Sequence, residues 1–296
     1  MEKNQKKSIL FALSAVLLWS TVASAFKLSL RYYDPAQLLL YASLTSFVVL
    51  LSMIIVQKKM ALFFSYTLKE YLSLALLGLI NPFIYYLVLF KAYALLPAQE
   101  AQPLNYTWAL TLSYLSVIIL KHSLHVRDII AGIVCYLGVI IISTHGDFVH
   151  FSFTSVEGVL LALFSTLLWS LYWLFNTRLE VDPVIGLCIN FGVALPFIFS
   201  WTLLFSNPFD FNLYGFLGSV YVGIFEMGFT FVLWLNAMKY STNASQVANL
   251  IFISPFISLL LIALILGESI LFSTFIGLVF IIIGLLIQQK TSKAKV

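Results

Sequence analysis

Apolar residues run along most of the chain in long segments, which short polar loops separate. An α-helix rises about 1.5 Å per residue, so a bilayer core of about 30 Å takes roughly 20 apolar residues. The segments are continuous and do not alternate between apolar and polar positions, which favours helices over a barrel. The pattern predicts an all-α integral membrane protein with ten transmembrane helices, over residues 8–30, 35–56, 71–95, 98–120, 128–144, 157–177, 183–205, 214–238, 245–266 and 270–288.

Composition agrees with a membrane protein. Hydrophobic residues make up 61% and charged residues 9% of the chain, whereas a soluble domain carries roughly 25% charged residues. The net charge of +4 is small and scattered, so we expect no nucleic-acid partner. The basic N-terminus precedes an apolar stretch of roughly 20 residues without an obvious small-residue cleavage site, which indicates a retained first helix and not a signal peptide.

Basic residues predict the orientation, because Lys and Arg accumulate in short cytoplasmic loops. With the N-terminus inside, three of the 16 Lys and Arg residues fall on the outer side, at Lys27, Arg31 and Lys91. Ten spans then also place the C-terminus inside. We expect a multi-pass protein of the cell inner membrane with both termini in the cytoplasm.

The chain repeats itself near its midpoint. "ALSAVLLWS" at 12–20 returns as "ALFSTLLWS" at 162–170, an offset of 150 residues. Three further features recur in the same order: an Asp-Pro pair (Asp34 and Asp182), a Gln and an Asn one turn apart (Gln102 with Asn105, Gln246 with Asn249), and two glycines in the last helix of each half. The domain boundaries predicted from these repeats are 1–144 and 157–288, followed by a basic cytoplasmic tail at 289–296.

Five spans per repeat is an odd number, so the second repeat enters the membrane from the opposite side to the first. Inverted repeats place a substrate site near the bilayer midplane between the two halves. They also suit alternating access, since one half can rock against the other. Trp19 and Trp169 both fall near the midplane, and we expect their segments to approach each other across the pseudo-two-fold axis.

The chain resembles the EamA-type, ten-helix branch of the drug/metabolite transporter superfamily. The resemblance rests on the paired "LLWS" segments, "NYTWAL" at 105–110, "SPFISLLLIALILGESI" at 254–270 and the glycine-spaced final helix. It implies a bacterial inner-membrane transporter, and many of these export amino acids or other metabolites by proton coupling or exchange. "NYTWAL" is similar to aromatic amino acid exporters, which tend to have Pro where Ala109 stands. The first repeat departs from the family, with Lys121 and His122 where the second has Gly267 and Glu268.

Glu226 is the deepest ionisable residue, about halfway along the eighth predicted span. Carboxylates inside a bilayer are costly and usually face a cavity or a partner. Helical spacing puts Thr230 and Trp234 on the same face. Glu226 is either a proton or cationic-substrate site, or a protonated residue hydrogen-bonded to a neighbouring helix.

Other polar and aromatic residues of the spans are candidates for the substrate cavity, where they would suit zwitterionic or aromatic molecules. The alternative for each is packing or hydrogen bonding between helices. They comprise Asn81 and Tyr85 beside Pro82, the paired amides, and the aromatic and serine residues near the midplane: Trp19, Ser20, Asn81, Tyr85, Gln102, Asn105, Tyr106, Trp108, Trp169, Ser170, Gln246 and Asn249.

Three charged residues, Lys27, Lys91 and Glu100, are interpreted as structural, and the alternative for each is a contact with substrate. Lys91 and Glu100 flank the turn at Pro97 and are expected to form an ion pair near the outer surface. Lys27 is expected to extend its long stem towards the outer interface.

Motifs of other classes are missing from the sequence. It has no GxxxxGK[ST] phosphate loop and no HExxH or other recognised metal spacing, so we expect no metal, cofactor or catalytic residue. The expected function is secondary transport, more often export, of a small organic metabolite. The alternatives are a membrane enzyme acting on a lipid or isoprenoid and a non-transporting membrane subunit. A small-molecule substrate and the lipid bilayer are the expected partners, and a homodimer is compatible with the sequence.

Overall fold

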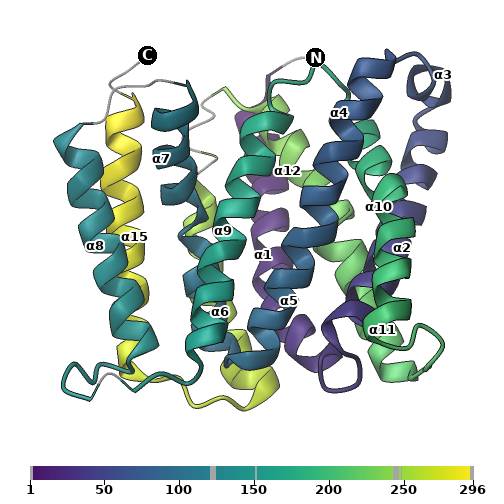
Figure 1. Ribbon diagram of the computed structural model, residues 1–296. Helices are drawn as coiled ribbons and strands as arrows, with labels where there is room; N and C mark the ends of the chain where they lie inside the picture. Colours follow the sequence, from purple (N-terminus) through teal and green to yellow (C-terminus); the bar gives the residue numbers. More distant parts are fainter. Residues whose placement is uncertain (1–2, 121–124, 151, 243–246, 248, 294–296) are drawn as a thin grey trace.

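The computed structural model describes residues 3–120, 125–150, 152–242, 247 and 249–293. Its elements are all helical over these residues (Figure 1). In chain order they are α1 (Gln5–Ser29), α2 (Pro35–Val56), α3 (Met60–Phe63), α4 (Leu68–Gly78), η1 (Leu79–Ile84), α5 (Tyr85–Leu95), α6 (Ala98–Tyr106), α7 (Trp108–Leu120), α8 (Val126–Ser143), α9 (Val156–Asn176), α10 (Pro183–Phe205), α11 (Leu213–Phe225), α12 (Phe229–Tyr240), η2 (Asn249–Ile253), α14 (Ser254–Leu261), η3 (Ile262–Leu266) and α15 (Phe272–Lys293).

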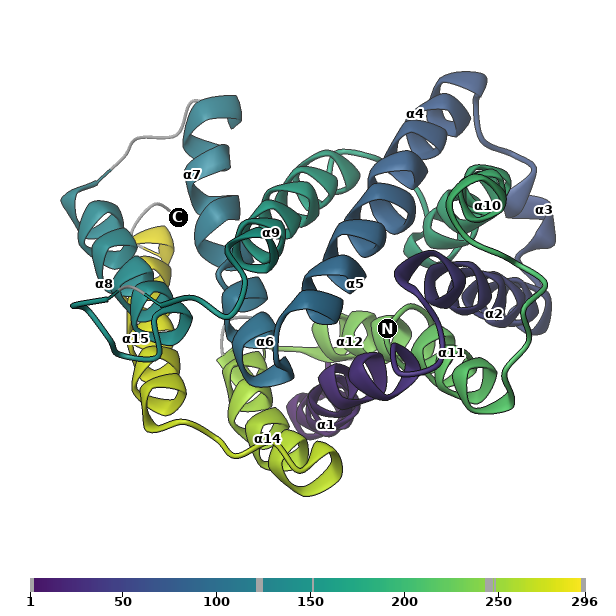
Figure 2. The same cartoon turned by 60° about the horizontal axis from the view of Figure 1, so that its bottom comes forward.

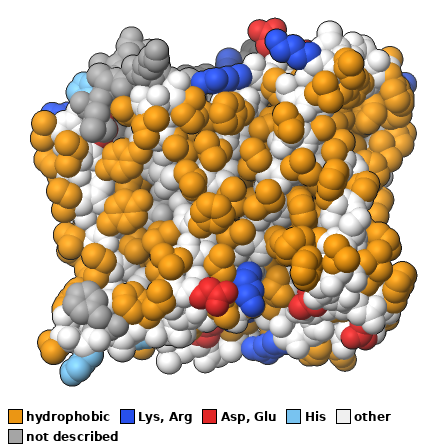
Figure 3. Space-filling view, in the orientation of Figure 1, with side chains coloured by type: hydrophobic (Ala, Val, Ile, Leu, Met, Phe, Trp, Pro, Cys, Tyr) orange, Lys and Arg blue, Asp and Glu red, His pale blue; other side chains and the backbone are white. Residues whose placement is uncertain are grey.

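These helices stand side by side as membrane spans. Seven helical segments among the described residues are long and apolar enough to cross a bilayer, and two shorter apolar segments, Leu250–Leu266 and Phe272–Gln288, accompany them. Apolar side chains cover the flank of the molecule, while charged side chains gather towards its two edges (Figure 3). The predicted ten-helix membrane fold is confirmed. The short helix α3, between the second and third spans, was not predicted.

The two halves pack as inverted copies. α1 begins and α15 ends at one face, called here the terminal face, whereas α9 begins at the opposite face (Figure 1). α1 packs on α12 and α9 packs on the corresponding α5; α2 packs on α11 and α10 on α4. α8 and α15, the last helices of the two halves, pair with each other at one end of the molecule (Figure 2).

The two Asp-Pro sequences begin equivalent helices. Asp34 Oδ1 accepts hydrogen bonds from Ala36 N and Gln37 N at the start of α2, at 2.7 and 3.0 Å. Asp182 caps α10 in the same way, and in both helices proline occupies the first turn. Because a free helix N-terminus has unsatisfied N–H groups, an Asp cap followed by Pro favours helix initiation there.

The third span of each half is broken near its middle. Pro82 lacks an N–H donor and disfavours helical geometry at the preceding residue, and Asn81 has φ −138° and ψ 114° inside η1. In the second half α11 ends before Glu226, and α12 begins after Gly228. Glu226 stands 145 residues after Asn81, so it occupies the equivalent position of the second repeat.

Close helix contacts beside both breaks depend on glycine. A Cβ on Gly78 would lie 2.5 Å from Asn190 O of α10, and one on Gly223 would lie 2.4 Å from Ala42 O of α2. These two glycines are also 145 residues apart. The break in each third span is thus held against the second helix of the other half.

Candidate functional site

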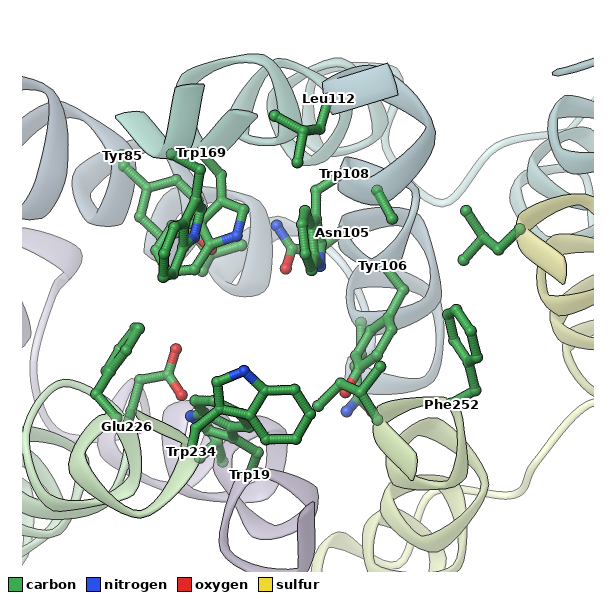
Figure 4. A pocket seen from close by; sticks show the side chains of 18 of the residues that line it. Trp19, Tyr85, Asn105, Tyr106, Trp108, Leu112, Trp169, Glu226, Trp234 and Phe252 are labelled. Carbon is green, nitrogen blue, oxygen red and sulfur yellow. The ribbon is translucent and has the colours of Figure 1, made fainter. Parts of the chain in front are cut away.

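A central cavity of about 680 Å³ lies between the two halves. Its walls come from α1 and α12 on one side and from α5 and α9 on the other, and residues of α6, α7, η2 and α15 complete the lining (Figure 4). A volume of this size falls in the range of small-molecule sites. The cavity therefore occupies the position expected for a site between inverted repeats.

The cavity opens towards the terminal face. Ser116, Thr177, Met238 and Gln288 line it near the ends of helices that finish at that face, and Thr177 is exposed. At the other end it stops against Phe26, Leu89 and Tyr93, which are 2%, 2% and 3% exposed. As far as the described residues define its walls, the cavity is accessible from the terminal face and shut at the opposite end.

Three polar residues, Lys27, Gln99 and Glu268, form a closing cluster beyond that end. Glu268 accepts hydrogen bonds from Ala98 N and Gln99 N, at 3.0 and 3.2 Å, at the start of α6. The Gln99 side chain bonds Ser269 O and Leu271 N at 3.0 and 2.9 Å. The side chains of Gln99 and Glu268 thus join α6 to the loop before α15. This loop follows Gly267, and it lies in the segment where the second repeat differs from the first.

Lys27 binds the C-terminal end of α5, and its extension towards the outer interface stays a prediction. Its ammonium donates to Tyr93 O at 2.8 Å and to Leu96 O at 2.9 Å, where α5 ends. Carbonyl groups at a helix C-terminus lack helical partners and attract a cation. Lys27 therefore fastens α1 to the end of α5.

Glu100 pairs with a different residue from the predicted Lys91. Its Oε1 lies 2.9 Å from His145 Nε2 and accepts a hydrogen bond from the Thr154 hydroxyl at 2.9 Å. Lys91 lies on the exposed side of α5, whereas Glu100 is 1% exposed and faces the loop between α8 and α9. The turn at Pro97 thus separates the two charges.

Nine of the predicted site residues line the cavity. Glu226 projects its carboxyl group into the space between two aromatic walls, and its Oε1 accepts a hydrogen bond from the Tyr86 hydroxyl at 3.1 Å (Figure 4). The nine are Trp19, Tyr85, Gln102, Asn105, Tyr106, Trp108, Trp169, Glu226 and Trp234.

Trp19 and Trp169 converge as the repeat predicted. The Phe231 ring lies 5.6 Å from the Trp19 ring and 6.0 Å from the Trp169 ring, measured between centroids. Asn105 has a packing contact as well, since its amide donates to Ser165 Oγ at 2.9 Å. Asn105 therefore both lines the cavity and forms a hydrogen bond between helices.

The two serines beside the tryptophans are not cavity residues. Ser20 Oγ donates to Val16 O at 2.6 Å and to Ser254 Oγ at 3.1 Å, while Ser170 Oγ donates to Trp108 O at 2.9 Å. Both hydroxyls thus connect the first helix of one half to the interrupted fourth span of the other half. Adjacent positions on a helix point in different directions, so each tryptophan lines the cavity while the serine next to it does not.

Thr230 and Asn81 also lie outside the cavity. The helical spacing that aligned Thr230 with Glu226 fails because the chain is not helical between them; the Thr230 hydroxyl donates to Phe225 O at the break. Asn81 is 2% exposed within η1. Gln246 lies outside the described residues, as does the side chain of Asn249.

Several cavity residues escaped the sequence argument. Trp173 follows Trp169 by one helical turn and lies on the same face, so periodicity alone points to it. No sequence pattern pointed to Phe231, because the direction of its side chain depends on the break at Glu226. Gln288, near the end of the last span, lines the cavity and donates to Ser113 Oγ at 2.7 Å.

Comparison with known proteins assigns the chain to a family. The model of the EamA-like transporter family matches residues 6–144 and again residues 156–288. The chain belongs to the EamA-like transporter family. Curated relatives of this EamA-like protein include an uncharacterized transporter of Clostridium kluyveri, 28% identical over 97% of this chain and 94% of that protein. Another is the uncharacterized transporter YvbV of Bacillus subtilis, 26% identical over 95% of this chain and 90% of that protein.

A solved crystal structure shares the fold of this EamA-like transporter. It superposes with a TM-score of 0.67 at 20% sequence identity, over 98% of this chain and 99% of that chain. The match shows that the whole ten-helix arrangement is common to both.

Proposed function

We propose that this EamA-like protein is a secondary transporter that carries a small organic metabolite across the cell inner membrane by alternating access. The observation that carries the proposal is the cavity between the inverted halves, open at the terminal face and closed at the other. If the two halves rock against each other, the open end closes and the closed end opens. The same cavity residues then become accessible from the other side of the membrane.

We infer that the terminal face is cytoplasmic, because most Lys and Arg residues fall in the loops on that side. The described cavity then faces the cytoplasm, which is the conformation that loads an exporter. Glu226, the acidic residue in the described cavity wall, supports proton coupling or solute exchange as the energy source.

Transport is tested by comparing metabolites inside and outside cells with and without the gene, followed by flux of the candidate solute in proteoliposomes. An exporter is expected to lower the intracellular level of one solute class and to move it across the vesicle membrane. An enzyme would convert its substrate without moving it, and a non-transporting subunit would do neither. Either of those results would contradict the proposal.

A further inference from the structure

Glu226 brings one carboxylate into a cavity whose walls are otherwise neutral. Its carboxyl group lies between Tyr85 and Trp169 on one side and Trp19 and Trp234 on the other (Figure 4). Among the described lining residues it is the sole acidic side chain, and none is Lys, Arg or His. The only hydrogen bond described for the carboxylate comes from the neutral Tyr86 hydroxyl. A proton or a cationic ligand can therefore neutralise it from within the cavity.

Aromatic rings surround this carboxylate in a connected series. Centroid distances are 5.6 Å from Trp234 to Trp19, 5.6 Å from Trp19 to Phe231, 6.0 Å from Phe231 to Trp169 and 4.8 Å from Trp169 to Tyr85. The faces of such rings carry negative electrostatic potential and attract cations, most strongly for tryptophan. The rings and the carboxylate therefore favour the same sign of ligand charge.

The equivalent position of the other half limits the charge of the ligand. Asn81 stands where the second repeat has Glu226, and it is neutral, buried and outside the cavity. The pseudo-symmetric wall therefore adds no second carboxylate. One carboxylate neutralises one positive charge. A divalent cation at this site would therefore keep one positive charge without a partner.

We propose that the cavity binds a monovalent organic cation, with its charged nitrogen at Glu226 and its apolar groups against the rings of Trp19, Trp169 and Phe231. This inference rests on the proposed transport function and names the substrate class. An anion would meet the Glu226 carboxylate without compensation. The carboxylate of a zwitterion would meet amide, hydroxyl and indole groups only, as far as the wall is described.

Binding of labelled N-methylquinolinium to the purified full-length protein tests the proposal, with benzyltrimethylammonium as a second cationic probe. The cations are expected to bind, and the neutral isostere 1-methylnaphthalene and the anion 1-naphthoate are expected to compete at least about tenfold more weakly. This comparison uses the wild-type chain, so it does not depend on the folding of any variant.

Variants then assign the binding to the proposed residues. Glu226→Gln is expected to weaken cation binding by about 30-fold and Trp169→Leu by about tenfold. The matched controls are Glu157→Gln, at an exposed glutamate in the first turn of α9, and Trp201→Leu, at a tryptophan of α10 outside the cavity. Both controls are expected to bind like the wild type.

The inference is overturned if neither cation binds, if the neutral isostere competes equally, or if the well-folded Glu226→Gln protein binds the cations as before. Export of a neutral or anionic solute that persists in Glu226→Gln vesicles would also overturn it, while leaving the proposed transport function intact. Absence of any solute flux in the metabolite comparison would reject the transport function itself.

Discussion

Thr230 shows how one side chain maintains the break beside Glu226. Its hydroxyl donates to Phe225 O, where α11 ends and the carbonyl group has lost its helical partner. Ser46 of α2 donates to Met227 O at 3.0 Å and so provides a hydrogen bond for a second carbonyl group in the break. The two hydroxyls keep the non-helical backbone hydrogen-bonded inside a membrane protein, where unsatisfied carbonyl groups are costly.

Thr230→Val is expected to destabilise the protein by about 1–3 kcal/mol, because it keeps the shape of the side chain but removes the donor to a buried carbonyl group. The measurement is the thermal unfolding midpoint of the purified protein in detergent. Ser52→Ala is the control, since Ser52 is exposed and bonds only Val48 O within its own helix. An equal midpoint for Thr230→Val and Ser52→Ala would contradict the role given to Thr230.

At the scale of elements, α8 and α15 meet through reciprocal glycines. A Cβ on Gly138 would lie 2.4 Å from Gly277 O, and one on Gly277 would lie 2.6 Å from Gly138 O. Small residues allow helices in a membrane to approach at backbone distance. The contact joins the last helices of the two halves, which are equivalent in the repeat.

Gly138→Ala is therefore expected to lower stability by about 1–3 kcal/mol, because the added methyl group pushes α8 and α15 apart. Gly186→Ala is the matched control. Its Cβ would lie 3.5 Å from Leu74 Cδ2, an ordinary contact, and alanine favours the helix more than glycine does. Thermal unfolding should rank the two variants in that order, and a Gly138→Ala protein as stable as Gly186→Ala would refute the packing argument.

At the scale of the whole molecule, the closing cluster of Lys27, Gln99 and Glu268 lies beyond the shut end of the cavity, and under the proposed alternating access we expect it to stabilise the conformation closed at that end. Its hydrogen bonds connect α1, α5, α6 and the loop before α15, and we expect opening at that face to break several of them. In an equilibrium between two conformations, loss of contacts made in one of them shifts the population towards the other.

Gln99→Ala is expected to increase the population open at the face opposite the termini by about fivefold or more, since it removes hydrogen bonds present only in the closed state. A cysteine introduced at Leu89, at the closed end of the cavity, reports on this opening through its labelling rate with a membrane-impermeant maleimide applied from that face. Gln57→Ala, at the end of α2, serves as the control. An unchanged labelling rate in Gln99→Ala would show that the cluster does not control access.

The sequence by itself determined the number of spans, the inverted repeat and the convergence of Trp19 with Trp169, because these depend on segment length, on an odd number of spans and on similarity between halves. It also located Glu226 as an acidic residue deep within a span. It did not determine which neighbours share the cavity with Glu226. Helical spacing assigned Thr230 to the cavity on the assumption of an unbroken helix, and the two serines were assigned to it from their place beside the tryptophans.

The tertiary structure decided those positions through contacts between distant segments. The break after Phe225 turns Thr230 away and brings Phe231 between the two tryptophans, and it is fixed by contacts with α2. Glu100 likewise pairs with His145 and not with Lys91, because the loop between α8 and α9 folds over α6. Such pairings depend on which helices meet and at what depth, and local sequence patterns contain no information about either.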